Sequence, residues 1–317
     1  MTAVSVVLPL YNAKPYIAEA IRSILAQTLG DFEFIVVDDG STDGSRAVVD
    51  GIDDSRLRVI TQQNAGLVGA LNRGIEEASH EYVARMDHDD VSHPERLACQ
   101  VAALDAAPAV ALVASCYAVI GDAGVQRVEH LPSAPGALAR QLFFRNVVPH
   151  GGAMFRRSVV LRLGGYRQVS PCEDYDLWTR VLEDHEVASV PRILFGYRLS
   201  AGGMSATAPV AQRDCTRAVR AGLWSRRTPA RATARAIRAE VAELRRRHAL
   251  PAVAAYRTVA FDQLGLARQD ARHGRASSSV QAVAALAGGT ALGLRDVARR
   301  GAESDACVRD LEWWRAR

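Results

Sequence analysis

The sequence predicts an α/β fold with a mostly parallel sheet, helices on both faces and a helical extension at the C-terminus. Two observations lead to this prediction. Runs of β-branched residues alternate with segments of helical spacing through the first ninety residues. Such alternation is typical of parallel strands joined by right-handed helical crossovers. The chain has 317 residues, enough for one large domain of this class and an accessory region.

The first strand is expected over residues 4–9, where an apolar, β-branched run ends at a proline. A helix is expected after Pro15, because Ile17, Ile21 and Ile24 recur at helical spacing. The alternation continues with strands over 34–37, 57–60 and 82–86 and with helices over 46–52 and 67–78. Because these strands are expected to be parallel, their carboxyl ends should meet at one edge of the sheet.

The chain after residue 90 has a less regular pattern. The expected elements are a helix over 94–106, a strand over 110–120, loops around Pro132, Pro135 and 148–152, a helix from Cys172 and a last strand over 190–198. We expect one domain over residues 1–210, with a first half over 1–100 and a second over 101–210, and a separate helical region over 211–317.

The composition excludes several classes of protein. Hydrophobic residues make up 49% and charged residues 23%, which disfavours disordered and collagen-like chains. No stretch reaches the roughly 18 uncharged apolar residues of a membrane span, and the first ten residues lack the basic start of a secretory signal. The five cysteines form no C-x-x-C pair, so reduced thiols are expected rather than disulfides or zinc ligands. These observations favour a cytoplasmic protein.

Charge divides the chain near residue 210. Residues 1–210 contain 18 basic and 25 acidic residues, whereas residues 211–317 contain 21 and 10. Three interpretations stay open for the basic region: a solvated helical appendage, a homodimerisation element, or peripheral contact with the anionic inner face of a membrane. Nucleic acid is not expected as a partner, because no zinc-finger or RNP-type pattern is present.

Polar side chains follow three of the predicted strands. Pro9–Asn12 follows the first strand, Asp38 and Asp39 follow the second, and Asp87 and Asp89 follow the fourth. Ligands of open parallel sheets bind beyond the carboxyl ends of the strands. In extended geometry Asp87 and Asp89 point the same way, so both can bind one hard cation, and Mg²⁺ or Mn²⁺ with a diphosphate fits that pair.

Each feature has a simpler interpretation when it is taken alone. An isolated D-x-D is most often a solvated acidic turn, and Asp38–Ser41 has the composition of a helix-capping turn. Their joint occurrence at neighbouring strand ends favours a binding site. The chain has no G-x-G-x-x-G after the first strand, no P-loop, no G-x-S-x-G and no H-E-x-x-H, which disfavours the enzyme classes that use those motifs. The remaining use of a carboxylate-held metal is to bind an activated phosphate leaving group.

A series of short motifs spans about residues 4–200 in a distinctive order. They are Ser5–Asn12, Ile21–Leu29, Phe34–Asp43, Asn64-x-Gly66, Asn72-x-Gly74, Ala84–Asp90, Pro94–Leu97, Gly164–Tyr166 and Glu173–Trp178. Together they resemble the motifs of family-2 glycosyltransferases. The resemblance implies a GT-A fold, a nucleoside-diphosphate sugar donor with a UDP-sugar favoured, a Mn²⁺ or Mg²⁺ cofactor, and inversion at the anomeric carbon.

The resemblance also implies roles for single residues in the nucleotide-sugar half, residues 1–100. Asp89 would bind the metal, and Asp87 would bind the ribose or belong to the metal shell. Either Asp38 or Asp39 would accept a hydrogen bond from the base or the ribose. The residues expected to bind the donor nucleotide are Pro9, Tyr11, Asn12, Asp38, Asp39, Asn64 and Asp87.

Residues 101–210 would form the acceptor-side half, with Asp174 as the candidate base and Glu173 beside it. An alternative for this pair is two acids favoured by the dipole of a helix N-terminus, which would lower their pKa values. A carboxylate of low pKa can still accept the proton late in the transition state. Weaker acceptor-side candidates are His150, Arg156 and Trp178, each with a structural role as its alternative.

We therefore expect a metal-dependent, inverting glycosyltransferase. Its acceptor would be a saccharide, a lipid-linked or a small molecule, in polysaccharide, glycolipid or glycoconjugate biosynthesis. One alternative is a sugar-phosphate nucleotidyltransferase, although its Gly-rich signature after the first strand is missing. The other is non-catalytic binding of an anionic surface through the basic residues 211–317.

Overall fold

The computed structural model describes residues 3–134, 136–142, 146–200 and 305–317, together with Gln212, Cys215, Thr216 and Val219. Within this part of the chain, residues up to Thr216 and residues 305–317 pack into one compact unit. Most of the basic region predicted over 211–317 lies outside the described residues. None of the described helices has both the length and the apolar character needed to cross a membrane.

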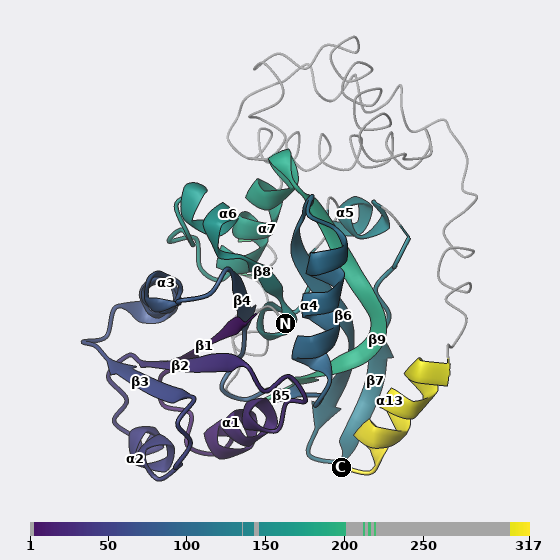
Figure 1. Cartoon of the computed structure of the whole chain (residues 1–317). Helices are drawn as coiled ribbons and strands as arrows, with labels where there is room; N and C mark the ends of the chain where they lie inside the picture. Colours follow the sequence, from purple (N-terminus) through teal and green to yellow (C-terminus); the bar gives the residue numbers. More distant parts are fainter. Residues whose placement is uncertain are drawn as a thin grey trace, which may run out of the picture. The chain divides into compact units, whose positions relative to one another are not determined.

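The described strands form one mixed, nine-stranded sheet (Figure 1). In chain order they are β1 (Val4–Leu10), β2 (Phe32–Asp38), β3 (Leu57–Thr61), β4 (Tyr82–Arg85), β5 (Val91–Ser92), β6 (Val110–Gly121), β7 (Gly124–Glu129), β8 (Met154–Arg156) and β9 (Glu186–Arg198). Their order across the sheet is β3-β2-β1-β4-β8-β6-β9-β5, and β7 pairs with β6. The four strands predicted in the first ninety residues are confirmed, and β1 to β4 pair in parallel.

Helices cover both faces of the sheet, as predicted (Figure 1). They are α1 (Ile17–Leu25), α2 (Ser45–Asp50), α3 (Gly66–Glu77), α4 (Arg96–Ala106), α5 (Ala137–Leu142), α6 (Arg157–Arg162), α7 (Glu173–Asp184) and α13 (Asp305–Arg315), with a 3₁₀ turn η1 (His150–Gly152). Alternate residues of β1 divide the core: Val6 and Leu8 pack in one cluster with residues of α1, α2 and α4. Val7 points to the other face, where it lies against Gly74 of α3.

Three strands were not expected, and all three run antiparallel to a neighbour. β5 has only two residues and pairs antiparallel with β9. β8 pairs antiparallel with β4 and β6, and β7 forms a hairpin with β6. β8 has only three residues, too few for a period-two pattern to be visible in the sequence. Its insertion beside β4 joins the two halves of the unit into one sheet.

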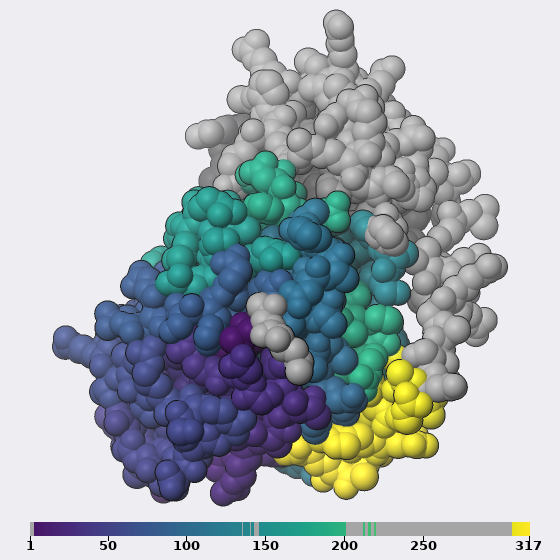
Figure 2. Space-filling view, viewed as in Figure 1, coloured from purple at the N-terminus to yellow at the C-terminus, as the bar shows by residue number. Residues whose placement is uncertain are grey.

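The C-terminal helix corrects the expected extent of the separate region, which was predicted to reach residue 317. Helix α13 packs against β9 rather than forming part of a separate region. In the space-filling view these yellow residues lie directly against the purple N-terminal residues (Figure 2). An ion pair of 3.3 Å between Arg317 and Glu19 of α1 joins the two ends of the chain. Residues 305–317 therefore belong to the same unit as residues 3–200.

Candidate active site

The carboxyl ends of β1, β2 and β4 meet at one edge of the sheet, as expected. Leu10 is in register with Asp38, and Val7 is in register with Arg85. Residues 87–90, here called the D-x-D turn, follow β4 at this edge. The turn replaces the extended geometry expected for Asp87 and Asp89, because β4 ends at Arg85.

Two buried arginines, Arg85 and Arg96, hold the D-x-D turn and the residues next to it in place. Arg85 donates a 2.6 Å hydrogen bond from Nη2 to Oδ1 of Asp87. Arg96 donates from Nη1 to the carbonyl oxygens of Arg85 at 3.1 Å and Gly151 at 2.7 Å. Both guanidinium groups are almost fully buried, so they act as fixed positive charges beneath the turn.

The three carboxylates of the turn influence each other strongly. Burial raises the pKa of Asp87, but Arg85 and His150 together bring it below its ordinary value. Burial and the charge of Asp87 raise the pKa of Asp89, and the same causes raise that of Asp90 further. Oδ2 of Asp90 is buried without a hydrogen-bond partner. Carboxylate oxygens are the ligand type that Mn²⁺ and Mg²⁺ prefer. Within the described residues, however, the three carboxylates of the turn do not bring their oxygens as close together as His93, Glu95 and Asp310 bring their ligand atoms.

Gly151 of η1 lets the second half of the unit approach this turn closely. A Cβ atom at this position would lie 2.7 Å from Oδ2 of Asp87 and 2.9 Å from Oδ2 of Asp90. Any side chain would therefore push the carboxylates away, so only glycine fits here. The acceptor-side half thus begins within contact distance of the D-x-D turn.

Asp38 and Asp39 lie at the end of β2 and are both buried. Asp39 accepts hydrogen bonds of 2.8 Å from Nε2 of Gln62 and from the backbone N–H groups of Ala65 and Gly66. It therefore caps the N-terminus of α3. Asp38 accepts one bond, from the N–H of Ser41 at 3.0 Å, and lies 3.8 Å from Arg46.

The segment after β1 is fixed to the loop after β2. Asn12 has a positive φ of 51°, and its Oδ1 accepts a 2.8 Å hydrogen bond from the N–H of Thr42. Its own N–H donates to Oγ of Ser41 at 3.2 Å. Pro9 is buried in β1, whereas Tyr11 is 48% exposed and Asn64 is also exposed. Tyr11 and Asn64 thus offer polar and aromatic surface near the same edge.

The acceptor-side acids lie at the start of α7, as expected. Asn146 donates a 2.6 Å hydrogen bond from Nδ2 to Oδ2 of Asp174. Glu173 is buried, with Oε1 at 4.0 Å from Nδ1 of His150 and with Oε2 unpartnered. His150 in turn makes a 2.9 Å hydrogen bond with the hydroxyl of Tyr166. Sequence reasoning missed Asn146, which no pattern marks, and it named Tyr166 only as the end of the Gly164–Tyr166 motif, without a role.

The acidity of this pair argues against the helix-dipole alternative. Burial and the neighbouring charge of Glu173 raise the pKa of Asp174 to about 7, although Asn146 and the N–H of Tyr175 stabilise its anion. Burial also raises the pKa of Glu173. The lowering that the helix-dipole alternative implies does not occur, because desolvation and like charge outweigh the effect of the helix N-terminus. Burial lowers the pKa of His150 to about 3, so its imidazole is neutral at neutral pH.

Two motifs that seemed independent in the sequence form one contact. Asn72 of α3 donates from Nδ2 to the carbonyl of Tyr166 at 2.9 Å and accepts from the N–H of Tyr166 at 2.8 Å. Gly165 has a φ of 67°, and a Cβ there would lie 2.5 Å from Oδ1 of Asn72. The Asn72-x-Gly74 and Gly164–Tyr166 motifs therefore join the first half of the unit to the second.

Two of the weaker acceptor-side candidates are structural. Trp178 is fully buried and packs against Phe155 and His150, so it offers no surface to a sugar. Arg156 donates to the carbonyl oxygens of Val110 and Leu104, both at 2.9 Å. Of the three, only His150 contacts the acids of the site.

Comparison with known proteins identifies the family. Residues 5–164 match the sequence model described as Glycosyl transferase family 2. The chain belongs to this family. The family-2 chain is 32% identical over 200 residues to the amylovoran biosynthesis glycosyltransferase AmsE of Erwinia amylovora, covering 61% of its own length and 75% of AmsE. The protein is therefore a glycosyltransferase, which leaves the nucleotidyltransferase alternative without support.

Solved structures confirm the GT-A fold of this family-2 glycosyltransferase. It aligns with S. aureus TarS 1–349 in complex with UDP-GlcNAc at a TM-score of 0.58 and 18% identity, covering 82% of this chain and 80% of TarS. It aligns with the mannosyltransferase PcManGT of Pyrobaculum calidifontis, in complex with GDP-Man and Mn²⁺, at a TM-score of 0.56 and 22% identity. That alignment covers 90% of this chain and 79% of PcManGT. At such identities the likeness concerns the fold.

Proposed function

We propose that this glycosyltransferase moves a sugar from a nucleoside-diphosphate sugar to an acceptor hydroxyl with inversion at the anomeric carbon. The observation that carries the proposal is the approach of two acidic groups at one sheet edge. The D-x-D turn lies against Gly151 of η1, and His150 of the same η1 lies 4.0 Å from Glu173. Asp87 also acts electrostatically on Asp174. A displacement reaction needs such a pair: one site for the leaving diphosphate and one for the acceptor proton.

On the donor side, we propose that Asp89 and Asp87 hold Mn²⁺ or Mg²⁺, which would neutralise charge on the departing diphosphate. Pro9, Tyr11, Asn12, Asp38 and Asn64 would surround the nucleoside. Asp39 already accepts three hydrogen bonds from residues 62–66, so we assign it to shaping this pocket, and Asp38 to accepting a bond from base or ribose. The bound UDP-GlcNAc of TarS and GDP-Man of PcManGT support a nucleotide sugar, with a UDP-sugar favoured.

On the acceptor side, Asp174 would take the proton of the attacking hydroxyl. A pKa of about 7 suits this role, because a base works best when its pKa lies near the working pH. Asn146 would orient the carboxylate through its hydrogen bond to Oδ2. Glu173 would raise the basicity of its neighbour by like charge. The similarity to AmsE supports an acceptor in polysaccharide biosynthesis.

The test is a hydrolysis screen of UDP-, GDP- and dTDP-sugars with Mn²⁺ or Mg²⁺, since slow donor hydrolysis needs no acceptor. We expect release of a nucleoside diphosphate from one class, its loss in EDTA, and its loss in Asp89→Asn. The matched control is Asp31→Asn, an exposed aspartate before β2. NMR of the released sugar would show the inverted anomer first. Retained configuration, or full activity in EDTA, would contradict the proposal.

A further inference from the structure

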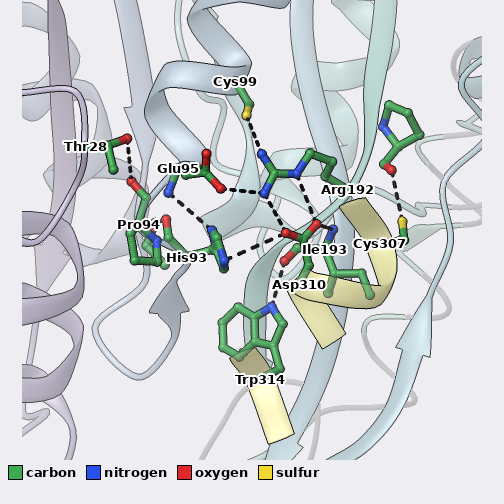
Figure 3. A network of polar contacts seen from close by, with 12 residues as sticks. Thr28, His93, Pro94, Glu95, Cys99, Arg192, Ile193, Cys307, Asp310 and Trp314 are labelled. Atoms are coloured by element: carbon green, nitrogen blue, oxygen red, sulfur yellow. Dashed lines mark hydrogen bonds and ion pairs between the residues drawn. The ribbon is translucent and has the colours of Figure 1, made fainter. Parts of the chain in front are cut away.

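A cluster of charged residues lies between β9, α13 and the segment after β5, and the proposed reaction does not explain it. His93, Glu95 and Asp310 place potential ligand atoms within 4.8 Å of one another. Figure 3 shows that Arg192 of β9 enters this cluster. Nη2 of Arg192 lies 2.6 Å from both Glu95 and Asp310. The guanidinium already forms ion pairs with both carboxylates, so we interpret the cluster as an ion-pair network rather than a metal site.

This network fastens α13 to β9. Asp310, only 1% exposed, accepts a 3.0 Å hydrogen bond from the N–H of Ile193 in addition to the bonds from Arg192. Trp314 donates from its indole N–H to the carbonyl of Ile193 at 2.7 Å (Figure 3). A Cβ at Gly196 would lie 2.5 Å from the Trp314 ring, so the helix rests directly on the strand backbone.

The end of β9 in turn holds the D-x-D turn. The N–H of Arg198 donates to Oδ1 of Asp90, and its Nε donates to the carbonyl oxygen of Asp89, both at 2.7 Å. The strand β5, which directly follows the turn, pairs antiparallel with β9, with Val91 opposite Gly196. The position of the turn therefore depends on the position of residues 196–198.

A second contact links α13 to the same arginine. Nη2 of Arg198 donates a 2.6 Å hydrogen bond to Glu19. Glu19 also pairs with Arg317 at 3.3 Å, and the guanidinium of Arg317 lies over the ring of Trp313. The C-terminal helix thus reaches Arg198 both through the backbone of β9 and through Glu19.

We propose that α13 is a positioning element for the D-x-D turn, and that Arg198 is the positioning residue through which it acts. The inference rests on the proposed function, since it assigns a purpose to the placement of Asp89. Arg198 holds the backbone carbonyl of Asp89 and the carboxylate of Asp90, while Oγ of Ser200, two residues after Arg198, donates a 3.0 Å hydrogen bond to Oδ2 of Asp89. Loosening α13 lets residues 196–198 shift and weakens the cation site.

The test measures Mn²⁺ affinity in the presence of UDP, by electron paramagnetic resonance on the full-length protein well below its melting temperature. We expect Arg198→Gln to raise the dissociation constant of Mn²⁺ about tenfold or more, as is typical for partners that orient a metal ligand. Arg198→Lys, which keeps the charge and one donor, should recover part of the affinity. The double variant Trp314→Phe/Arg317→Ala keeps the aromatic packing and should weaken Mn²⁺ binding in the same direction.

The matched control is Arg315→Ala, an exposed arginine of the same helix. A purely structural role would lower the melting temperature of the variants while the folded protein keeps its Mn²⁺ affinity, and that result would overturn the inference. If wild-type protein binds Mn²⁺ with UDP and Arg198→Gln binds it equally well, Arg198 is not the positioning residue. If the wild-type protein binds neither Mn²⁺ nor Mg²⁺ with UDP or GDP, the proposed function fails and the inference fails with it.

Discussion

The side chain of Asp174 shows how two opposing effects set the acidity of one group. Its position at the start of α7 and its hydrogen bond from Asn146 stabilise the anion. Burial and the adjacent Glu173 destabilise it more, which leaves the pKa at about 7. The carboxylate is therefore a much stronger base than an exposed aspartate. It becomes protonated, and can no longer accept a proton, as the pH falls through this value.

The pH dependence of kcat/KM should follow this titration. Because only the ionised carboxylate accepts a proton, the rate should fall tenfold per pH unit below about 7 and level off above it. Glu173→Gln removes the like charge that raises the pKa of Asp174, so the falling limb should move to lower pH. The control is Asp184→Asn at the exposed end of α7. A limb that stays in place in Glu173→Gln would contradict the assignment.

Asp174→Asn should separate catalysis from binding. The amide keeps the shape and loses only the proton acceptor, so turnover should fall by about 10²–10⁴-fold. The affinity for the nucleotide should change little, because the donor site lies at the D-x-D turn. Single-turnover transfer and calorimetry with UDP measure the two quantities. Near-normal turnover in this variant would exclude Asp174 as the base.

At the scale of elements, Asp39 links the end of β2 to the start of α3. It is 3% exposed and satisfies the N–H groups of Ala65 and Gly66, which have no partner inside the helix. Asp39→Ala removes the bond to Ala65 and leaves Gly66 only its 3.2 Å bond to Oδ1 of Asn64, so it should lower the free energy of unfolding by about 0.5–2 kcal/mol, as for other helix caps. Urea denaturation measures the change, with the exposed Asp31→Ala as the control. An equal effect of the two substitutions would show that the cap does not stabilise α3.

The predictability of the elements depended on their length and on local pattern. Strands β1 and β2 were recognisable because each contains a short apolar run rich in β-branched residues, next to a helical repeat. β8 was not, because its three residues are defined by pairing with β4 and β6. At the site, the strand-end acids were predictable from topology, whereas Asn146 and the contact of Asn72 with Tyr166 depend on tertiary packing. Burial excludes Trp178 as a surface for a sugar, and hydrogen bonds to backbone carbonyls give Arg156 a structural role. Sequence spacing shows neither of these directly.

At the scale of the whole molecule, the main difference from the sequence expectation is that α13 belongs to the catalytic unit. Its hydrogen-bonding partner Ile193 is 117 residues away from Asp310. A charge count cannot reveal this, because it averages α13 with the rest of the basic region. The helix is held by the buried Trp314 and by Asp310, which accepts hydrogen bonds from the side chain of Arg192 and from the backbone N–H of Ile193.

Trp314→Ala should therefore destabilise the full-length protein strongly. The side chain is 2% exposed and makes the indole hydrogen bond to Ile193, so the loss should be about 3–5 kcal/mol. Val308→Ala, at an exposed position of the same helix, should cost much less. Urea denaturation followed by circular dichroism compares the two variants. Similar midpoints for both would mean that α13 contributes little to the stability of the unit.

The long separation between β9 and α13 also has a consequence for synthesis on the ribosome. At about 5–20 residues per second, the 117 residues from Ile193 to Asp310 take about 6–23 s to translate. During that interval the strand that will hold the D-x-D turn has emerged, but the helix that covers it has not. A nascent chain interrupted before Asp305 would keep the backbone of Ile193 and Gly196 uncovered. The contacts of α13 with Ile193 can therefore form only after translation has passed residue 305.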